Sequence, residues 1–282
     1  MSKELFKDRK LIIATKHSKE KVIAPPLEEA LGVFCFVHDD FDTDTLGTFT
    51  GEIERELDPL AAARQKCLMA MELSNCDLGL ASEGSFGAHP SMFFASADEE
   101  FLIIIDKKNN LEIIVREFST ETNFNGSEIK NEKELINFAE VTKFPSHGLI
   151  LRKSKTENNN IIKGITNLQD LKKAFQLLFK KFNSVYAETD MRAMYNPSRM
   201  KVIENATKKL IEKINSCCPQ CDIPGFGVTD VKKGLECSLC SSPTNSTLSY
   251  IYVCQHCQLI EEEMYPHKKT TEEPMYCDFC NP

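Results

Sequence analysis

Short apolar runs and helical apolar stripes alternate along residues 1–216 of the chain. Short apolar runs between polar turns are typical of buried strands. They predict strands at residues 11–15, 33–37, 78–82, 92–95, 101–105, 111–116, 148–151 and 185–188. Because strands that alternate with helices are typical of α/β proteins, we predict a three-layer α/β domain with a central mixed sheet over residues 1–216.

Helix signals lie between these runs. Pro59 begins a segment rich in Ala, Leu and Met, which predicts a helix over residues 59–73. Asn131 followed by Glu134 resembles a capping box at a helix start. Asn196-Pro197 predicts the start of a helix that extends to about residue 215. Two apolar stripes at helical spacing are expected to face the core: Leu168, Leu171, Phe175, Leu178 and Phe182, and Val202, Ile203, Ala206, Leu210 and Ile214.

The first residues and the hydropathy of the chain bear on its location. Residues 1–8 carry acidic side chains and no apolar core, so they do not resemble a signal peptide. No apolar run approaches the ~20 residues that a membrane span needs. We therefore expect a soluble, cytoplasmic protein with no membrane partner.

Eight of the 12 cysteines occur in four Cys-x-x-Cys units. The units are Cys218/Cys221, Cys237/Cys240, Cys254/Cys257 and Cys277/Cys280. Each unit makes a tight turn that aims two thiolates at one tetrahedral ion, and two such turns complete the four ligands. A reducing cytoplasm would not sustain disulfides between them. The pattern predicts two structural zinc ions in a small C-terminal double zinc-ribbon domain over residues 217–282.

The spacing leaves open which units share an ion. Sequential pairing joins the first unit to the second and the third to the fourth. Nested pairing joins the second to the third in a hairpin, and the outer units to each other. Residues 247–253 alternate like a strand and lead into Cys254, which suits the nested hairpin. Both arrangements use the same eight ligands.

Polar residues with chemical potential follow several predicted strands, at the edge where α/β proteins bind ligands. Thr15, Lys16 and Lys19 follow the first strand and precede a helix, which suits a phosphate. An ordinary solvated turn explains them equally well. Glu83 follows residues 78–82 among glycines, in a position suited to bind a divalent metal or to activate water. The alternative is a glycine turn with an incidental carboxylate.

Two further places carry candidate ligand-binding residues. Lys66 lies in the first turns of its helix and could reach a phosphate, although a solvated helix face is the alternative. Asp190, Arg192 and Arg199 flank a strand end and a helix start, where they could clamp a phosphate or carboxylate. A structural Asp–Arg pair is equally consistent. Four side chains are predicted to face one cleft: Lys19, Glu83, Asp190 and Arg192.

Several segments resemble a bacterial family of unknown function with a Cys-rich, zinc-ribbon tail. The resemblance is carried by residues 47–56, 82–87, 190–199 and 274–282. It covers nearly the whole chain and implies no activity.

Residues 11–120 also resemble the house-cleaning nucleoside triphosphate pyrophosphatases of the inosine/xanthosine triphosphatase and Maf-like group. The segments that carry this resemblance are Thr15 with Lys16 or Lys19, residues 47–49 followed by Ala63-x-x-Lys66, Glu83-Gly84, and Asp190 with Arg192. It implies an elongated α/β fold with a central cleft, an acidic metal site and magnesium-dependent cleavage of non-standard nucleotides. By this resemblance the Thr–Lys loop would bind the triphosphate, Glu83 would mark the acidic strand end, and Asp190 with Arg192 would close on the base. The sequence departs from the group at Glu20, where a lysine is usual, and at Ala61, where a metal-binding acid is expected.

Two functions therefore compete. The first is a metal-dependent phosphohydrolase acting on a nucleotide or a related phosphorylated metabolite. In it, Glu83 and Asp190 or Glu52 would hold magnesium, while Lys16, Lys19, Lys66 and Arg192 would hold phosphates. The second is a ligand-sensing or scaffold domain whose zinc ribbons dock a protein partner.

Charge argues against nucleic acid as the partner. The chain has a formal net charge of −8. Residues 217–282 hold four basic and nine acidic residues, a balance of 4 − 9 = −5. Two tetrathiolate zinc sites would add further negative charge. Phosphate contacts need clustered Lys and Arg, and a nucleic-acid-binding ribbon would normally be basic, whereas this one is acidic.

We predict no salt-sensitive binding to random-sequence DNA or RNA, because few cations are present to release counterions from the backbone. Fluorescence anisotropy with labelled duplexes at about 50 and 200 mM salt measures this. Tight complexes that weaken steeply over this range would show that the acidic balance is misleading.

Overall fold

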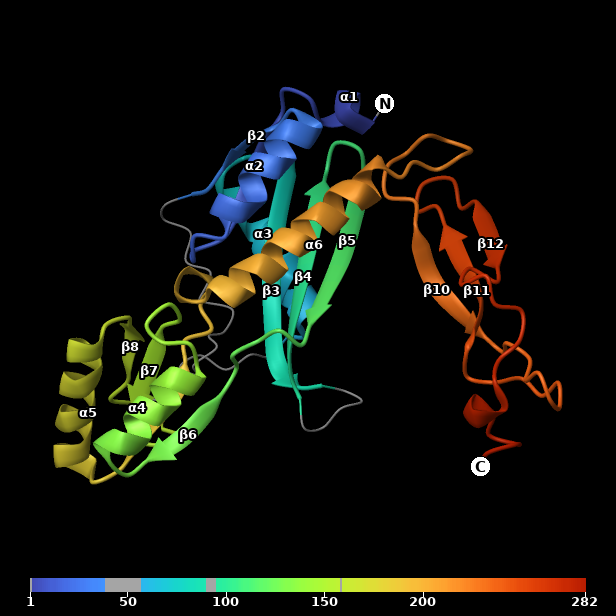
Figure 1. Cartoon of the computed structure of the whole chain (residues 1–282). Coiled ribbons are helices and arrows are strands. Elements are labelled where there is room, and N and C mark those ends of the chain that lie inside the picture. The colour runs from blue at the N-terminus through green and yellow to red at the C-terminus, as the bar shows by residue number, and fades with distance from the viewer. Residues whose placement is uncertain (1, 39–56, 90–94, 158) are drawn as a thin grey trace. The chain divides into compact units, whose positions relative to one another are not determined.

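The computed structural model describes residues 2–38, 57–89, 95–157 and 159–282 (Figure 1). Two compact units divide the chain, one formed by Phe6–Leu210 and the other by Met1–Leu5 with Ile211–Pro282. We call them the 6–210 unit and the C-terminal unit. The domain boundary after residue 216 stays a prediction. Among the described residues, no helix is both long and apolar enough to cross a membrane.

A five-stranded mixed sheet lies in the 6–210 unit, as the alternating pattern predicts. Its strands are β1 (Lys10–Ala14), β2 (Phe34–Phe36), β3 (Leu78–Ala88), β4 (Ser96–Asp106) and β5 (Leu111–Ser119), in the order β2-β1-β3-β4-β5. The strand β1 runs parallel to both β2 and β3, whereas β3, β4 and β5 are antiparallel neighbours. The predicted strand at 92–95 falls mostly on residues outside those described.

Two helices connect the parallel strands. The helix α2 (Glu20–Leu31) ends at Gly32, whose φ of 68° suits glycine. The helix α3 (Pro59–Leu73) has the predicted bounds, and the Asp58 carboxylate caps it by accepting the N–H groups of Leu60 and Ala61. Apolar side chains of α3 pack against β1, β3 and β4, so α3 covers one face of the sheet.

The strand β3 is longer than the apolar run predicts, and this corrects the place of Glu83. The prediction ends the strand at Ser82 and puts Glu83 just after the strand end, among glycines. Instead, β3 pairs with β4 residue by residue from Leu78 through Ala88, so Glu83 lies inside the strand. Glycine is needed at position 84 because the neighbouring side chains leave no room for a Cβ, which would stand 2.4 Å from a carboxylate oxygen of Glu100.

A second sheet holds the later strands of the same unit, a separation that the sequence pattern does not reveal. Its strands are β6 (Gly126–Ile129), β7 (Leu149–Arg152), β8 (Ile162–Ile165) and β9 (Val185–Thr189), in the antiparallel order β6-β9-β7-β8. The helices α4 (Glu132–Val141) and α5 (Leu168–Phe182) bury their apolar faces in the core of this sheet. The N-cap half of the capping box is confirmed, since Glu134 donates its N–H to the Asn131 side chain; the Glu134 carboxylate accepts the N–H of Lys130, one residue before the cap.

The helix α6 (Pro197–Asn215) begins where Asn196-Pro197 predicts. The Asn196 side chain accepts the N–H of Arg199 at 3.0 Å, which satisfies a donor of the first turn. Its predicted inner face is buried throughout: Val202, Ile203, Ala206, Leu210 and Ile214. Asn196 and Arg199 are also fully buried, so the start of this helix lies in the interior of the 6–210 unit.

The C-terminal unit contains a small antiparallel sheet. The strands β10 (Val228–Lys233), β11 (Thr247–Val253) and β12 (Ile260–Met264) are arranged with β11 in the centre. A short 3-10 helix, η3 (Pro274–Tyr276), precedes the last cysteine unit, and the N-terminal helix α1 (Ser2–Phe6) starts in the same unit. The predicted strand at 247–253 is confirmed.

Candidate functional sites

All four Cys-x-x-Cys units adopt the same turn. In each, the residue after the second cysteine donates its N–H to the carbonyl of the first cysteine. The bonds are Asp222 to Cys218 at 2.9 Å, Ser241 to Cys237 at 2.9 Å, Gln258 to Cys254 at 3.0 Å and Asn281 to Cys277 at 2.9 Å. This turn brings the two thiols of a unit to the same side, ready to share one ion.

The units pair in an interleaved order. The first cluster consists of Cys218, Cys221, Cys254 and Cys257, and the second cluster of Cys237, Cys240, Cys277 and Cys280. The first unit therefore meets the third, and the second meets the fourth. This differs from both the sequential and the nested pairing. The strand β11 pairs with both β10 and β12. The second and third units, at its two ends, belong to different clusters and do not close a common hairpin.

Distances within each cluster fit a tetrahedral metal site. Sγ atoms of different units approach to 3.6 Å twice in the first cluster, and to 3.6 and 3.9 Å in the second. Four sulfurs at about 2.3 Å from a zinc ion lie ~3.8 Å apart. A disulfide needs about 2.05 Å, so the eight cysteines are free thiols.

The thiols of the second cluster affect one another's ionisation. A hydrogen bond from Ser242 helps to lower the pKa of Cys240 to about 6. The neighbouring Cys240 raises the pKa of Cys280 to about 12, so thiolates at this spacing oppose one another. A divalent ion would allow both to ionise. Each cluster could therefore hold a metal ion such as zinc.

A buried charged network lies on the face of the large sheet opposite α3. The Lys19 ammonium donates to the carbonyl and hydroxyl of Ser82 at 3.1 and 3.0 Å. The Ser82 hydroxyl donates to Glu100 at 3.2 Å, and the Arg199 Nε donates to Glu100 at 2.5 Å. Arg199 also donates to the Met191 carbonyl at 2.5 Å. These contacts connect α2, β3, β4 and α6 through charges that are almost fully buried.

Asp98 belongs to the same face of β4, two residues before Glu100. It is 1 % exposed, and its Oδ1 has no hydrogen-bond partner among the described residues. Burial and the neighbouring Glu100 raise the pKa of Asp98 to about 7. Burial lowers the pKa of Lys19 to about 8. An acid and a base whose pKa values are displaced toward neutrality are typical of catalytic sites.

Lys66 and Glu83 form a separate buried pair, with a Lys66 Nζ to Glu83 Oε2 distance of 2.5 Å. Successive side chains of a strand point to opposite faces. Gly79 faces α3, since a Cβ there would meet Met71, and Glu83, four residues further along the strand, points to the same face. Glu83 therefore faces α3, whereas Gly84 faces Arg199.

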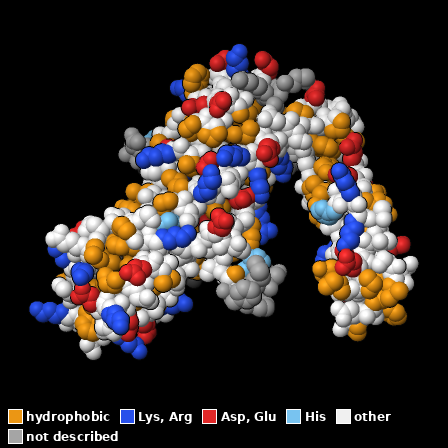
Figure 2. Space-filling view, viewed as in Figure 1, with side chains coloured by type: hydrophobic (Ala, Val, Ile, Leu, Met, Phe, Trp, Pro, Cys, Tyr) orange, Lys and Arg blue, Asp and Glu red, His pale blue; other side chains and the backbone are white. Residues whose placement is uncertain are grey.

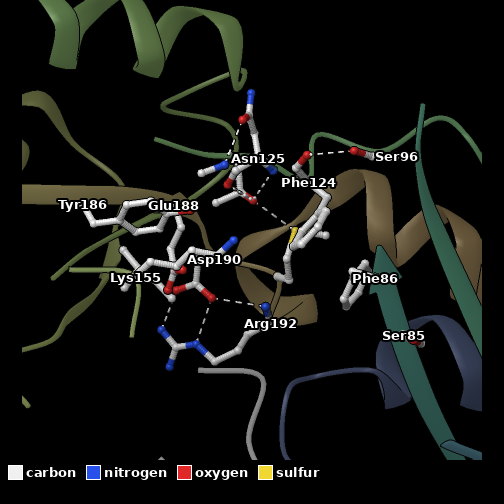
Figure 3. Close-up of a pocket in the computed structure, with 14 residues that line it drawn as sticks. Ser85, Phe86, Ser96, Phe124, Asn125, Lys155, Tyr186, Glu188, Asp190 and Arg192 are labelled. Carbon is white, nitrogen blue, oxygen red and sulfur yellow. Dashed lines mark hydrogen bonds and ion pairs between the residues drawn. The ribbon is translucent and has the colours of Figure 1, made fainter. Parts of the chain in front are cut away.

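A pocket of ≈ 470 Å³ lies at the far end of β3. Figure 3 shows Ser85 and Phe86 of β3 on one side and Tyr186, Glu188 and Lys155 on the other. The rings of Phe86 and Phe124 are 5.9 Å apart in a stacked orientation. The Phe86 ring also lies 5.0 Å from the guanidinium carbon of Arg199, which connects the pocket wall to the buried network.

Asp190 and Arg192 also line this pocket (Figure 3). Asp190 is fully buried and accepts the Nε and Nη2 of Arg192 at 2.9 and 2.6 Å. It also accepts the N–H groups of Arg192 and Gly164 at 3.1 and 3.0 Å. These four donors engage both carboxylate oxygens and hold the guanidinium in place.

The predicted site residues thus fall into three groups, of which the first two are close enough that the charges of Glu83 and Lys66 affect the pKa of Lys19. Lys19 and Arg199 belong to the buried network, Lys66 and Glu83 to the pair facing α3, and Asp190 and Arg192 to the pocket. Thr15 and Lys16 follow β1, where Thr15 accepts the N–H of His17 at 3.4 Å. Glu52 and residues 47–49 lie outside the described residues. The single cleft for Lys19, Glu83, Asp190 and Arg192 stays a prediction.

Asp98 and Glu100 are the residues that the sequence reasoning misses. They precede the apolar run 101–105, and acids at the start of a strand usually indicate a solvated end. The available signal is their alternation with Ala97 and Glu99, which puts both acids on one face of a strand.

Gly84 allows the buried ion pair, so we expect Gly84→Ala to lower the free energy of unfolding by about 3 kcal/mol. A Cβ at this position would stand 2.4 Å from Glu100 and 2.6 Å from Arg199. Gly87→Ala is the matched control, since its Cβ would have no neighbour within 4 Å. Urea unfolding followed by circular dichroism compares the two. Equal midpoints would show that the pair is not constrained by Gly84.

Comparison with known proteins identifies the family of the chain. Residues 66–282 match the family described as Domain of unknown function (DUF6671). The match starts at Lys66 in α3 and includes the pocket, β4 and both cysteine clusters, but neither Lys19 nor β1. None of the curated proteins matches the chain. Since the match covers more than half of the sequence, the chain belongs to the DUF6671 family, a domain of unknown function.

Proposed function

We propose that the 6–210 unit binds a nucleotide or a related phosphorylated metabolite in the pocket and hydrolyses its phosphate linkage. The observation that carries this proposal is the contact of Phe86 with Arg199. Through it, a ring-lined pocket adjoins a buried network that contains an acid and a base with displaced pKa values.

The lining of the pocket suits such a ligand. Phe86, Phe124 and Tyr186 offer flat apolar surfaces for a heteroaromatic ring. Lys155 and Arg192 offer positive charge for an anionic group, and Asn125 offers amide hydrogen bonds. The volume of ≈ 470 Å³ lies within the range of small-molecule sites.

Asp98 is the residue we assign to proton transfer. It pairs with Phe86 across the β3–β4 ladder, so its side chain lies beside that of Phe86, which lines the pocket, on the same face of the sheet. With a pKa of about 7 it could both give and accept a proton near neutral pH. Lys19, at the other end of the network, forms an ion pair with Glu100 at 3.8 Å.

Magnesium has no prepared site among the described residues of this unit. Among the described residues, the groups of three or more candidate metal ligands are the two cysteine clusters, and both lie in the C-terminal unit. Glu83 is paired with Lys66, and Glu100 with Arg199. We therefore derive no catalytic step from a metal ion.

The test is a panel of nucleoside mono- and triphosphates, with binding measured by calorimetry and hydrolysis by phosphate or pyrophosphate release, with and without magnesium. We expect Phe124→Ala to weaken binding about tenfold, since stacking on an aromatic ring contributes about 1–3 kcal/mol. Asp98→Asn should lower turnover at least about 100-fold with little change in affinity.

Phe34→Ala is the matched control, because Phe34 is an exposed ring outside the pocket. It should change neither affinity nor turnover. Absence of binding across the panel would reject the pocket as a nucleotide site. Binding without turnover in any condition would reject hydrolysis and favour the second candidate below.

The second candidate is a ligand-sensing or scaffold domain whose C-terminal unit docks a protein partner. The specific observation in its favour is that Asp190 is saturated by four donors and Glu83 is paired with Lys66. Both acids that the sequence nominates for catalysis thus have structural partners.

In either case, we infer that the C-terminal unit is a double zinc ribbon held by two structural zinc ions. The interleaved clusters and their sulfur distances support this inference. The central strand β11 leads into Cys254 of the first cluster, and the β10–β11 connection carries Cys237 and Cys240 of the second. Each ion would therefore help to fix the same small sheet.

We predict about two zinc ions per chain by elemental analysis. Replacing Cys218, Cys221, Cys254 and Cys257 together by serine should remove one ion, because all four belong to one cluster. Replacing Cys218, Cys221, Cys237 and Cys240 should remove both ions. Sequential pairing predicts that this second variant loses a single ion. A stably folded C-terminal unit without zinc would contradict the structural role.

A further inference from the structure

Exposed apolar side chains occupy the tips of both turns in the second cluster. Leu239 lies between Cys237 and Cys240 and is 73 % exposed; Phe279, in the partner turn, is 75 % exposed. Sulfurs of the two turns meet at 3.6 and 3.9 Å, so these turns lie side by side. The two side chains therefore belong to one end of the C-terminal unit.

Two more large apolar side chains extend this surface. Met275 and Tyr276 of η3 lead directly into Cys277, and they are 59 % and 57 % exposed. We call Leu239, Met275, Tyr276 and Phe279 the apolar tip. Figure 2 shows hydrophobic side chains gathered at the end of the C-terminal unit. Contiguous exposed apolar surface of this kind is typical of protein interaction sites.

The turn itself does not require these residues. The equivalent positions in the first cluster are Gln220 and His256, both polar. These turns have the same backbone hydrogen bond and the same sulfur spacing as those of the second cluster. Leu239 and Phe279 are thus not explained by metal binding or by the fold of the turn.

Charge around the apolar tip selects the kind of partner. Glu236, Glu273 and Asp278 are exposed beside it. Lys269, the lysine closest in sequence to Met275, is paired with Glu272. A zinc ion with four thiolates would add a charge of about −2. Anionic lipid surfaces, nucleic acids and a second copy of this chain, with its net charge of −8, are all disfavoured by this rim.

We propose that the apolar tip docks a basic segment of a partner protein, in which apolar side chains cover Leu239 and Phe279 and flanking Lys or Arg face the acidic rim. The proposal rests on zinc occupancy of the second cluster and gives the second candidate function its binding surface. It is independent of the pocket in the 6–210 unit.

The test uses the full zinc-loaded chain and two labelled amphipathic peptides with the same leucine positions, one with lysine and one with glutamate at the polar positions. We expect the lysine peptide to bind at least about tenfold more tightly than the glutamate peptide. The variant L239S/F279S should weaken the lysine peptide at least about tenfold. The matched control Q220S/H256S changes the same two turn positions in the first cluster and should stay within about twofold.

Zinc content of each variant separates the possible failures. Loss of zinc in the wild-type chain would reject the proposed ribbon, whereas retained zinc without peptide binding would reject the docking proposal alone. Equal affinity for both peptides, or an equal loss in Q220S/H256S, would also overturn it. Sedimentation provides a further check: concentration-dependent dimers that L239S/F279S abolishes would assign the tip to a second copy of the chain.

Discussion

The buried ion pair between Glu100 and Arg199 is the constraint on which the interior of the 6–210 unit depends. A charge removed from water costs several kcal/mol unless partners surround it. Arg199 therefore needs the Glu100 carboxylate and the Met191 carbonyl, and Glu100 needs Ser82. These partners come from β3, β4, α6 and the segment after β9, so neutralising one guanidinium fixes the relative positions of elements distant in sequence. Only glycine at position 84 leaves room for the pair.

This constraint also determines which charged groups can act together. The alternation of side chains along β3 separates Ser82 and Gly84 from Glu83, which pairs with Lys66 on the α3 face. Lys19 joins the network through its ammonium group, which donates hydrogen bonds to the backbone carbonyl and the hydroxyl of Ser82. The strand β1 runs parallel to β3, and its last residue, Ala14, pairs with Ala81, so the chain leaves β1 near the level of Glu83, which itself lies inside β3. The direction of a strand, however, does not determine on which face of the sheet a given side chain lies.

Features set by contacts between residues close in sequence are predicted well, and features set by contacts between distant segments are not. The bounds of α3, the N-cap at Asn131 and the start of α6 are set by residues within one helical turn, and all three are confirmed. The eight cysteine ligands are likewise predicted, because Cys-x-x-Cys is a local geometry. The length of β3 is not, since it depends on pairing with β4 and on the space around Gly84. The second sheet depends on contacts between distant strands, which leave no local pattern. The alternation around Asp98 predicts its face of the strand, but its burial depends on contacts with other elements.

Interleaving of the cysteine units has a physical consequence that neither of the simpler pairings would have. The loop closed by the first cluster spans residues 218–257, and the loop closed by the second spans 237–280, so residues 237–257 belong to both. Closing a loop lowers the entropy of the unfolded chain, and a segment shared by two closures is constrained from both ends. That segment contains β11, the central strand that pairs with β10 and β12. Sequential pairing would give two independent ribbons, each able to open without the other. With a metal ion in each cluster, interleaved pairing would instead join the sheet and both sites in one cooperative structure, in a unit whose apolar core is small and whose side chains Leu239 and Phe279 face solvent.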